Sequence, residues 1–258
     1  MNSVPGGDAG AADQLENDVA ETLFGFRTAT AGELIDRLNV NPRLVRTVHE
    51  GVDPAFAERG EGTPPENISQ PYLLFVSTLE PRKNVVGVLQ AFRLLREWDY
   101  DGNLILVGRW GWHTESIRTE LESSPVRRWI HHLDYVERAQ LVEMYRHAEA
   151  LLFPSWIEGF GLPLLEAMAC GTPVITSGTS AMPEIAGPAG VYVDPASPHG
   201  IASAVAALRK DSHHRDRLIA LGRQRVEKFS WDRAAEATAS ILREVAGLPA
   251  DGPDEYRA

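Results

Sequence analysis

Five short apolar runs constrain the fold of this chain more than any other feature of its sequence. None of them alternates between apolar and polar residues, and Gly, Pro or charged residues lie close to their ends. Apolar runs without alternation are typical of strands that are covered on both faces, as in parallel sheets. The runs are Tyr72–Val76, Leu104–Val107, Leu151–Phe153, Val174–Thr176 and Val191–Val193.

Helical patterns lie between these runs. Apolar residues recur at the spacing of one helix face over residues 85–95, 141–148 and 201–208. Ser197 and Pro198 precede the third pattern and suit the cap and the first turn of a helix. This alternation predicts βαβ units and a Rossmann-like, doubly wound parallel sheet of the α/β class. Ligands of such sheets bind in the loops beyond the carboxyl ends of the strands, so we expect the functional residues there.

Composition excludes several classes of function. The formal net charge of −11 argues against a nucleic-acid-binding protein, because phosphate backbones attract basic surfaces. The single cysteine, Cys170, can form neither an internal disulfide nor a zinc cluster built on thiolates. No apolar run approaches the ~18 residues of a membrane span, and residues 1–8 lack the features of a secretory signal. We therefore expect a cytoplasmic protein that acts on small molecules.

Two other groups of reactive side chains are given structural interpretations. His131–His132 and His213–His214 are adjacent pairs, whose members point in different directions on any regular element. They make poor metal sites and are interpreted as solvated. Cys170 lies among small residues at a predicted helix end and is interpreted as a core residue, not a nucleophile.

The segment from Glu158 to Glu166 follows a predicted strand and carries the most chemical information. Gly159 and Gly161 permit close approach of the backbone to a ligand, and Pro163 suits the first turn of a helix. A helix N-terminus here offers free N–H groups to phosphate or sugar oxygens, and carboxylates accept hydrogen bonds from hydroxyls. On these residues alone, a glycine-rich turn with one acid near the helix dipole and one on a solvated face is an equally good interpretation.

Glu158 and Glu166, with seven residues between them, resemble the E-x7-E motif of the retaining glycosyltransferases of family four. Further stretches resemble this family in the same order, over about residues 23–246. The linked set is specific, whereas each stretch alone is not. The stretches are His49–Asp53, Ser77–Asn84, Tyr135–Val136, Glu166–Val174, Pro183–Glu184, Ala189–Gly190 and Phe229–Trp231.

The resemblance implies a GT-B fold, in which two Rossmann-like domains face each other across a cleft. The N-terminal domain of such enzymes binds the acceptor, and the C-terminal domain binds the nucleotide-sugar donor. By resemblance, Glu158 contacts hydroxyls of the transferred sugar and Glu166 contacts the ribose. Between these two glutamates, the residues expected to contact the donor are Gly159, Phe160, Gly161 and Leu162.

Arg82 and Lys83 lie in the loop after the first predicted strand of this domain. A diphosphate carries concentrated negative charge, for which a guanidinium and an ammonium group are suitable partners. A lone Arg-Lys pair is more often a basic surface loop, but residues 80–84 resemble the family's segment, which implies that Lys83 and Arg82 bind the donor phosphates. Many family members have an arginine where this chain has Thr78, so the resemblance supplies one cation fewer.

Gly108, Tyr135 and Val136 are candidates for contacts with the nucleoside. Gly108 ends a predicted strand and resembles the glycine that lets the nucleotide approach, although a simple turn glycine explains it equally well. By the same resemblance the backbone of Tyr135 and Val136 recognises the base. Here the chain departs from the family, because Asp134 stands where glycine is common.

The resemblance also divides the chain. Residues 49–230 are expected to form the nucleotide-sugar-binding domain, and residues 231–248 a crossover helix whose apolar face needs a partner. Residues 23–48 resemble the end of an acceptor domain, most of which is not found in the sequence. Residues 1–22 and 249–258 are expected to be a flexible extension and a tail. Three explanations stay open: a fragment of a longer enzyme, a subunit of a split enzyme, or a relic that only binds nucleotide.

The sequence therefore predicts the donor-binding half of a retaining glycosyltransferase that transfers a hexose from an NDP-sugar. The resemblance leans toward mannose and GDP-mannose, with a UDP-hexose as the other donor. No metal or other cofactor is expected, because no carboxylate cluster accompanies the motif. The alternative is a non-catalytic nucleotide-sugar-binding module, or a subunit that pairs with an acceptor-domain chain or with itself through the C-terminal helix. Peripheral attachment to the inner face of a membrane is compatible with both.

Overall fold

A computed structural model describes the chain at residues 23–25, 32, 35–58, 62 and 68–249. The predicted extension and most of the tail lie outside these residues, as does most of the Thr28–Ile35 stretch that resembles an acceptor domain. The chain divides into two compact units. The larger unit runs from Val52 to Ser230, and the smaller combines the residues up to Gly51 with those from Trp231 onward.

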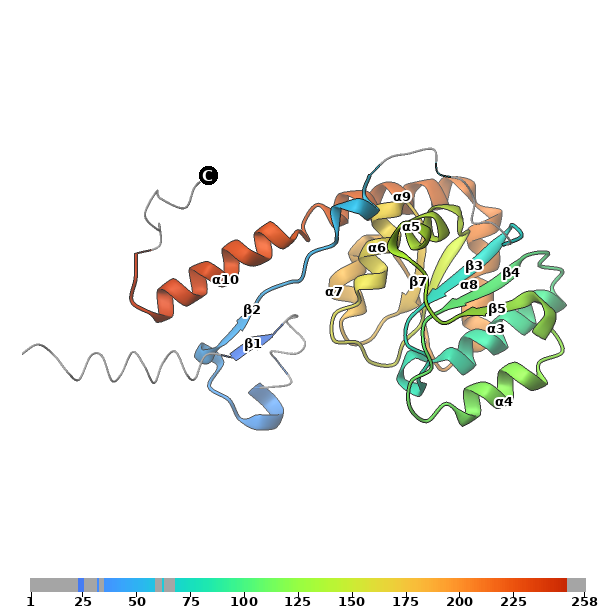
Figure 1. The fold of residues 1–258 in the computed structure, drawn as a ribbon, viewed down its shortest axis with the longest axis horizontal. Helices are drawn as coiled ribbons and strands as arrows, with labels where there is room; N and C mark the ends of the chain where they lie inside the picture. Colours follow the sequence, from blue (N-terminus) through green and yellow to red (C-terminus); the bar gives the residue numbers. More distant parts are fainter. Residues whose placement is uncertain (1–22, 26–31, 33–34, 59–61, 63–67, 250–258) are drawn as a thin grey trace, which may run out of the picture. The chain divides into compact units, whose positions relative to one another are not determined.

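The larger unit contains a six-stranded sheet whose strands are all parallel (Figure 1). The order across the sheet is β5-β4-β3-β6-β7-β8. All five apolar runs named from the sequence are strands of this sheet, and β5 is the strand that the sequence pattern did not reveal. The strands are β3 (Tyr72–Val76), β4 (Asn103–Val107), β5 (Ile130–Leu133), β6 (Ala150–Phe153), β7 (Val174–Ser177) and β8 (Gly190–Val193).

Helices cover both faces of the sheet, with α3 and α4 on one side and α5 and α6 on the other (Figure 1). The predicted doubly wound fold is therefore confirmed. Ser197 caps α8 as predicted, since its side chain accepts a hydrogen bond from the Gly200 amide. The α-helices of this unit are α3 (Val85–Glu97), α4 (Glu115–Ser123), α5 (Arg138–His147), α6 (Leu162–Cys170), α7 (Met182–Ala186), α8 (Pro198–Lys210) and α9 (Ser212–Val226). Short 3-10 helices are η2 (Pro54–Phe56), η3 (Pro81–Lys83), η4 (Arg127–Trp129) and η5 (Gly187–Ala189).

The central strands β3, β4, β6 and β7 lack alternation because both of their faces are buried. Leu73 and Phe75 pack with the residues of α3 and α8, whereas Tyr72 and Leu74 belong to the core beneath α5 and α6. All four side chains are 0% exposed. Burial on both faces removes any advantage of a polar residue at alternate positions, which is why these strands are continuous apolar runs.

The interpretation of His131 and His132 as solvated was wrong for His132. These two residues lie in the edge strand β5, and His132 Nε2 is 2.8 Å from the Gly108 carbonyl oxygen. The ring of His132 also packs edge-on against Trp110. His213 and His214 are exposed at the start of α9, as expected. Among the described residues, no group of three His, Cys, Asp or Glu side chains is placed to hold a metal ion.

The smaller unit contains two short parallel strands and one long helix. β1 (Leu23–Gly25) pairs with β2 (Val45–Thr47), which follows the 3-10 helix η1 (Pro42–Leu44). The predicted C-terminal helix is present as α10 (Trp231–Val245). Arg46 of β2 forms a 3.0 Å ion pair with Glu244 of α10, so the strand and the helix belong together. No described helix is long and apolar enough to cross a bilayer.

Candidate functional site

The order of the strands reverses direction between β3 and β6. From β3 the chain adds β4 and β5 on one side, and from β6 it adds β7 and β8 on the other. The loops that leave two such strands at their carboxyl ends diverge, and the crevice between them is the usual ligand site of a doubly wound sheet. These two loops contain the predicted phosphate-binding residues and the start of the E-x7-E motif.

Lys83 and Glu158 meet in this crevice, although they are 75 positions apart in the sequence. Lys83 Nζ lies 2.7 Å from both Glu158 Oε1 and Glu158 Oε2. Both residues are buried, at 7% and 4% exposure. The structure thus brings together two predicted catalytic residues that are far apart in the sequence.

Arg82 connects Glu158 to a second buried carboxylate. Its Nη1 is 3.2 Å from Glu158 Oε2, and its Nε is 2.5 Å from Glu80 Oε1. Glu80 is only 1% exposed, whereas the Arg82 side chain is 45% exposed. We call Glu80, Arg82, Lys83 and Glu158 the carboxyl-end cluster. Glu80 was missed from the sequence, although it lies in the segment that carries the resemblance.

Asn84 fixes the position of the Lys83 backbone. It has φ +58°, a left-handed conformation that asparagine tolerates better than most residues, and it separates η3 from α3. Its Nδ2 donates to the carbonyl oxygens of Pro154 at 3.0 Å and Pro195 at 2.8 Å. The side chain therefore ties the β3 loop to the loops that follow β6 and β8. Sequence reasoning missed this residue as well.

Glu158 is held through its backbone by Ser180. The Glu158 amide lies 3.2 Å from Ser180 Oγ, and that hydroxyl lies 3.0 Å from the Glu158 carbonyl oxygen. Beyond it, Gly161 has φ +109° and precedes the first residue of α6, a conformation that favours glycine. A Cβ at Gly159 would meet no atom within 4 Å, so its backbone borders open space.

The other residues between the two glutamates have unequal exposure. The Phe160 side chain is buried and packs edge-on against Phe229, 6.0 Å between ring centroids. Leu162 is half-buried at the start of α6. The Phe160 side chain is therefore part of the core, and only its backbone is left for the predicted donor contact.

Glu166 lies within α6 and is held by a tyrosine. Tyr145 OH donates a 2.7 Å hydrogen bond to Glu166 Oε2. Burial raises the pKa of the Glu166 carboxyl, while the Tyr145 hydrogen bond and the nearby charge of Arg138 act to lower it. Arg138 itself forms a 2.5 Å ion pair with Asp53. Tyr145 is a further residue that sequence reasoning assigned only to a helix face.

Gly108 is explained by its surroundings in the fold. It has φ +143°, and a Cβ at this position would lie 1.9 Å from the Ser77 carbonyl oxygen. Tyr135 is 64% exposed, with the Arg109 guanidinium 5.9 Å from its ring centroid, and Val136 is half-buried. The nucleoside contacts of these residues stay predictions.

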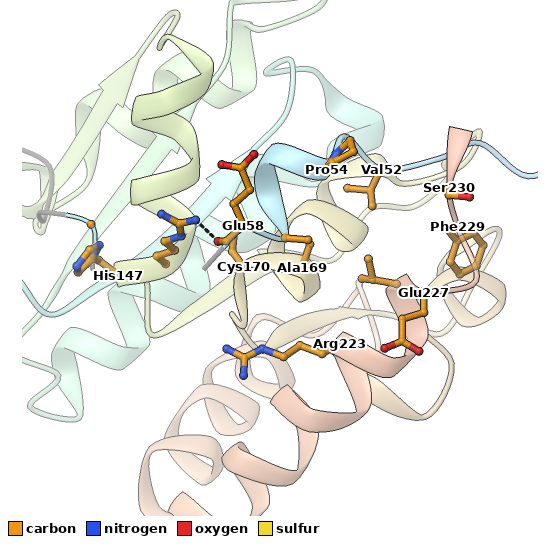
Figure 2. A pocket seen from close by; sticks show the side chains of 14 residues that line it. Val52, Pro54, Glu58, His147, Ala169, Cys170, Arg223, Glu227, Phe229 and Ser230 are labelled. Carbon is orange, nitrogen blue, oxygen red and sulfur yellow. Dashed lines mark hydrogen bonds between the residues drawn. The ribbon is translucent and has the colours of Figure 1, made fainter. Parts of the chain in front are cut away.

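A cavity of about 800 Å³ lies elsewhere in the larger unit (Figure 2). It is located at the C-terminal ends of α5 and α6, where His147 and Cys170 line it, and Arg223 of α9 borders it. Cys170 is half-buried on the cavity wall and is not the fully buried core residue that the sequence predicted. Burial raises the pKa of its thiol to about 12, which agrees with the interpretation that it is not a nucleophile. The charged lining of the cavity is mixed, with Arg146 and Arg223 beside Glu58 and Glu227.

The chain matches the family described as glycosyl transferases group 1 over residues 61–225. It belongs to this family. The match covers both loops of the carboxyl-end cluster and the whole E-x7-E segment.

Two relatives in the family are named mannosyltransferases. O-antigen chain mannosyltransferase B of Escherichia coli is 38% identical over 175 residues, which are 67% of this chain and 46% of that protein. The MMP alpha-(1->4)-mannosyltransferase of Mycolicibacterium hassiacum is 31% identical over 224 residues, 85% of this chain and 53% of that protein. The chain spans about half the length of these curated relatives.

The fold is shared with larger glycosyltransferases. The crystal structure of a glycosyltransferase from Rickettsia africae superposes with a TM-score of 0.77 at 15% identity. The superposition covers 95% of this chain and 68% of that one. The sheet and its flanking helices therefore share the fold of that protein.

Proposed function

We propose that this chain binds the nucleotide-sugar donor of a retaining glycosyltransferase that transfers a hexose, with mannose favoured. The observation that carries this proposal is the meeting of Arg82, Lys83 and Glu158 in the crevice where the strand order reverses. An ammonium and a guanidinium suit a diphosphate, and a carboxylate beside them suits sugar hydroxyls.

The diphosphate leaving group would be stabilised by Lys83, Arg82 and the N-terminus of α6. Charge develops on the phosphate as the bond to the sugar breaks, and fixed cations and amide dipoles stabilise that charge without reorganisation. The open space at Gly159 leaves room for the donor beside the backbone. Configuration would be retained by displacement on the front face of the sugar, with no metal ion taking part.

The remaining donor contacts are assigned along the same strand ends. Glu158 would accept hydrogen bonds from hydroxyls of the hexose, and Glu166 would accept them from the ribose. The nucleoside would extend toward Gly108 and the exposed Tyr135, with the backbone of Val136 reading the base. Mannose is favoured because both relatives described above are named mannosyltransferases. GDP-mannose is the first donor to test, and a UDP-hexose the second.

The acceptor would be bound by a second domain, in a longer form of this chain or in another chain. The relatives are about twice as long as the part that this chain matches. α10 has an apolar side with exposed Trp231 and Leu242, which would pack on that domain or on a second copy.

Calorimetric titration of the purified chain with GDP, UDP, GDP-mannose and UDP-glucose tests the donor assignment. We expect saturable binding with a clear preference for one base. Arg209→Gln, which changes a cation at the opposite end of the sheet, is the matched control and should bind like the wild type. Absence of binding to all four compounds would refute the proposal.

A further inference from the structure

In the donor-free site, residues that would bind different parts of the donor form ion pairs with each other. Lys83, which would bind phosphate, has its Nζ 2.7 Å from both oxygens of Glu158, which would bind the sugar. Arg82, the second phosphate ligand, also reaches Glu158 at 3.2 Å. The buried Lys83 is therefore available to a diphosphate only when it leaves this carboxylate or shares it, whereas the Arg82 side chain is 45% exposed.

The charges of the carboxyl-end cluster balance. Arg82 and Lys83 contribute two positive charges, and Glu80 and Glu158 contribute two negative ones. Both carboxylates are at most 4% exposed, so water screens their charge poorly. A diphosphate entering the crevice meets side chains whose formal charges sum to zero, so its binding depends on an exchange of partners.

We propose that Glu158 is a specificity-determining residue that makes the site select an intact nucleotide-sugar over the bare nucleoside diphosphate. The inference rests on the donor assignment above. An intact donor offers its phosphates to Lys83 and its sugar hydroxyls to Glu158, so both members of the pair find new partners. A bare nucleoside diphosphate draws Lys83 away and gives Glu158 nothing in return.

The cost of that second case is large because Glu158 is buried. A buried carboxylate that loses its cation is destabilised far more than a surface carboxylate, since water solvates a buried charge poorly. The nucleoside diphosphate also carries more negative charge than the intact donor, which adds repulsion from Glu158. Selection of this kind would favour substrate binding over retention of the nucleotide product.

Glu158→Gln is the decisive variant, because glutamine keeps the shape and the hydrogen-bonding oxygen while it removes the charge. Titration with GDP, UDP, GDP-mannose and UDP-glucose should show the variant binding its nucleoside diphosphate about tenfold more tightly than the wild type does. Its affinity for the intact donor should not rise, so the preference for the intact donor shrinks. Asp101→Asn removes an exposed carboxylate that pairs with Arg209 at the opposite end of the sheet, and it should leave that preference unchanged.

Two results would overturn the inference. One is a nucleoside diphosphate affinity in Glu158→Gln that does not exceed the wild-type value; the other is an unchanged preference for the intact donor. If the variant does not fold, the wild-type chain decides: it must bind the intact donor more tightly than the diphosphate. A wild-type chain that binds none of the four compounds would remove the donor assignment itself, which is a different outcome from binding without selection.

Discussion

Two ion clusters lie at opposite ends of the same sheet, and they differ mainly in burial. In the amino-end cluster, Arg209 of α8 pairs with Asp101 at 3.0 Å and with Glu149 at 3.2 Å, just before β4 and β6 begin. The Asp101 side chain is 71% exposed. In the carboxyl-end cluster, the side chains of Lys83 and Glu158 are 9% and 5% exposed.

The difference indicates which charges stabilise the fold and which bind a ligand. Exposed ion pairs form at little cost and contribute little, because water solvates both partners almost as well. Buried pairs require desolvation of both charges and are seldom the most stable solution for a core. Buried charges at the crevice of a doubly wound sheet therefore indicate function.

Lys83→Gln should have the largest effect of the changes that test this comparison. It leaves Glu158 buried without its closest cation, which should lower the free energy of unfolding by about 3 to 5 kcal/mol in urea denaturation. Calorimetry should show a much greater loss of affinity for the nucleoside diphosphate than for the nucleoside. Lys228→Gln, at an exposed lysine, is the control and should change stability by less than about 0.5 kcal/mol. Equal losses for both ligands would refute the phosphate contact.

Two glycine variants at the carboxyl end of the sheet separate effects on stability from effects on ligand binding. Gly108→Ala should lower the free energy of unfolding by about 2 to 3 kcal/mol, because the new Cβ collides with the Ser77 carbonyl at a strained φ. Gly159→Ala should leave stability within about 0.5 kcal/mol of the wild type and weaken intact-donor binding. Urea denaturation and calorimetry measure the two effects. Wild-type donor affinity in Gly159→Ala would mean that the open space is not used.

Arg209→Gln should have a small effect, as expected for the amino-end cluster. Its half-exposed ion pairs predict a loss of less than about 1 kcal/mol in the free energy of unfolding, which added salt should reduce. Nucleotide affinity should not change. A loss as large as that of Lys83→Gln would show that burial is not what separates the two clusters.

The smallest expected effect is a slope of stability with pH that comes from Glu166. Burial raises the pKa of this carboxyl, so the folded chain holds the proton at pH values where the unfolded chain has released it. Stability should therefore fall as the pH rises from the unfolded pKa through the folded one. Glu166→Gln should remove this part of the slope in urea denaturation at several pH values. An unchanged slope would show that burial does not act on this carboxyl.

Much of the fold could be predicted because it depends on patterns within one segment. The runs of β3, β4, β6, β7 and β8 and the helix faces of α3, α5 and α8 carry their own apolar periodicity. β5 escaped detection because an edge strand needs less apolar surface, and its His131 and His132 read as polar. α4 and α9 were not predicted either, since their residues are mostly polar.

The candidate site was predicted in part. Glu158, Glu166, Arg82 and Lys83 were named because motif spacing and residue type are visible in the chain. Glu80, Asn84, Tyr145 and Ser180 were not, because a positioning residue is defined by what it touches. Tyr145 is ordinary on a helix face until its hydroxyl is found 2.7 Å from Glu166.

The sequence by itself determined the strand–helix alternation, the family and the residue types of the site. Those properties follow from local periodicity and from linked motifs, which need no contact between distant segments. Only the tertiary structure decided that Lys83 and Glu158 share one buried ion pair. That pairing depends on the β3 and β6 loops leaving neighbouring strands at the point where the sheet order reverses, and on burial that removes the water between the two charges.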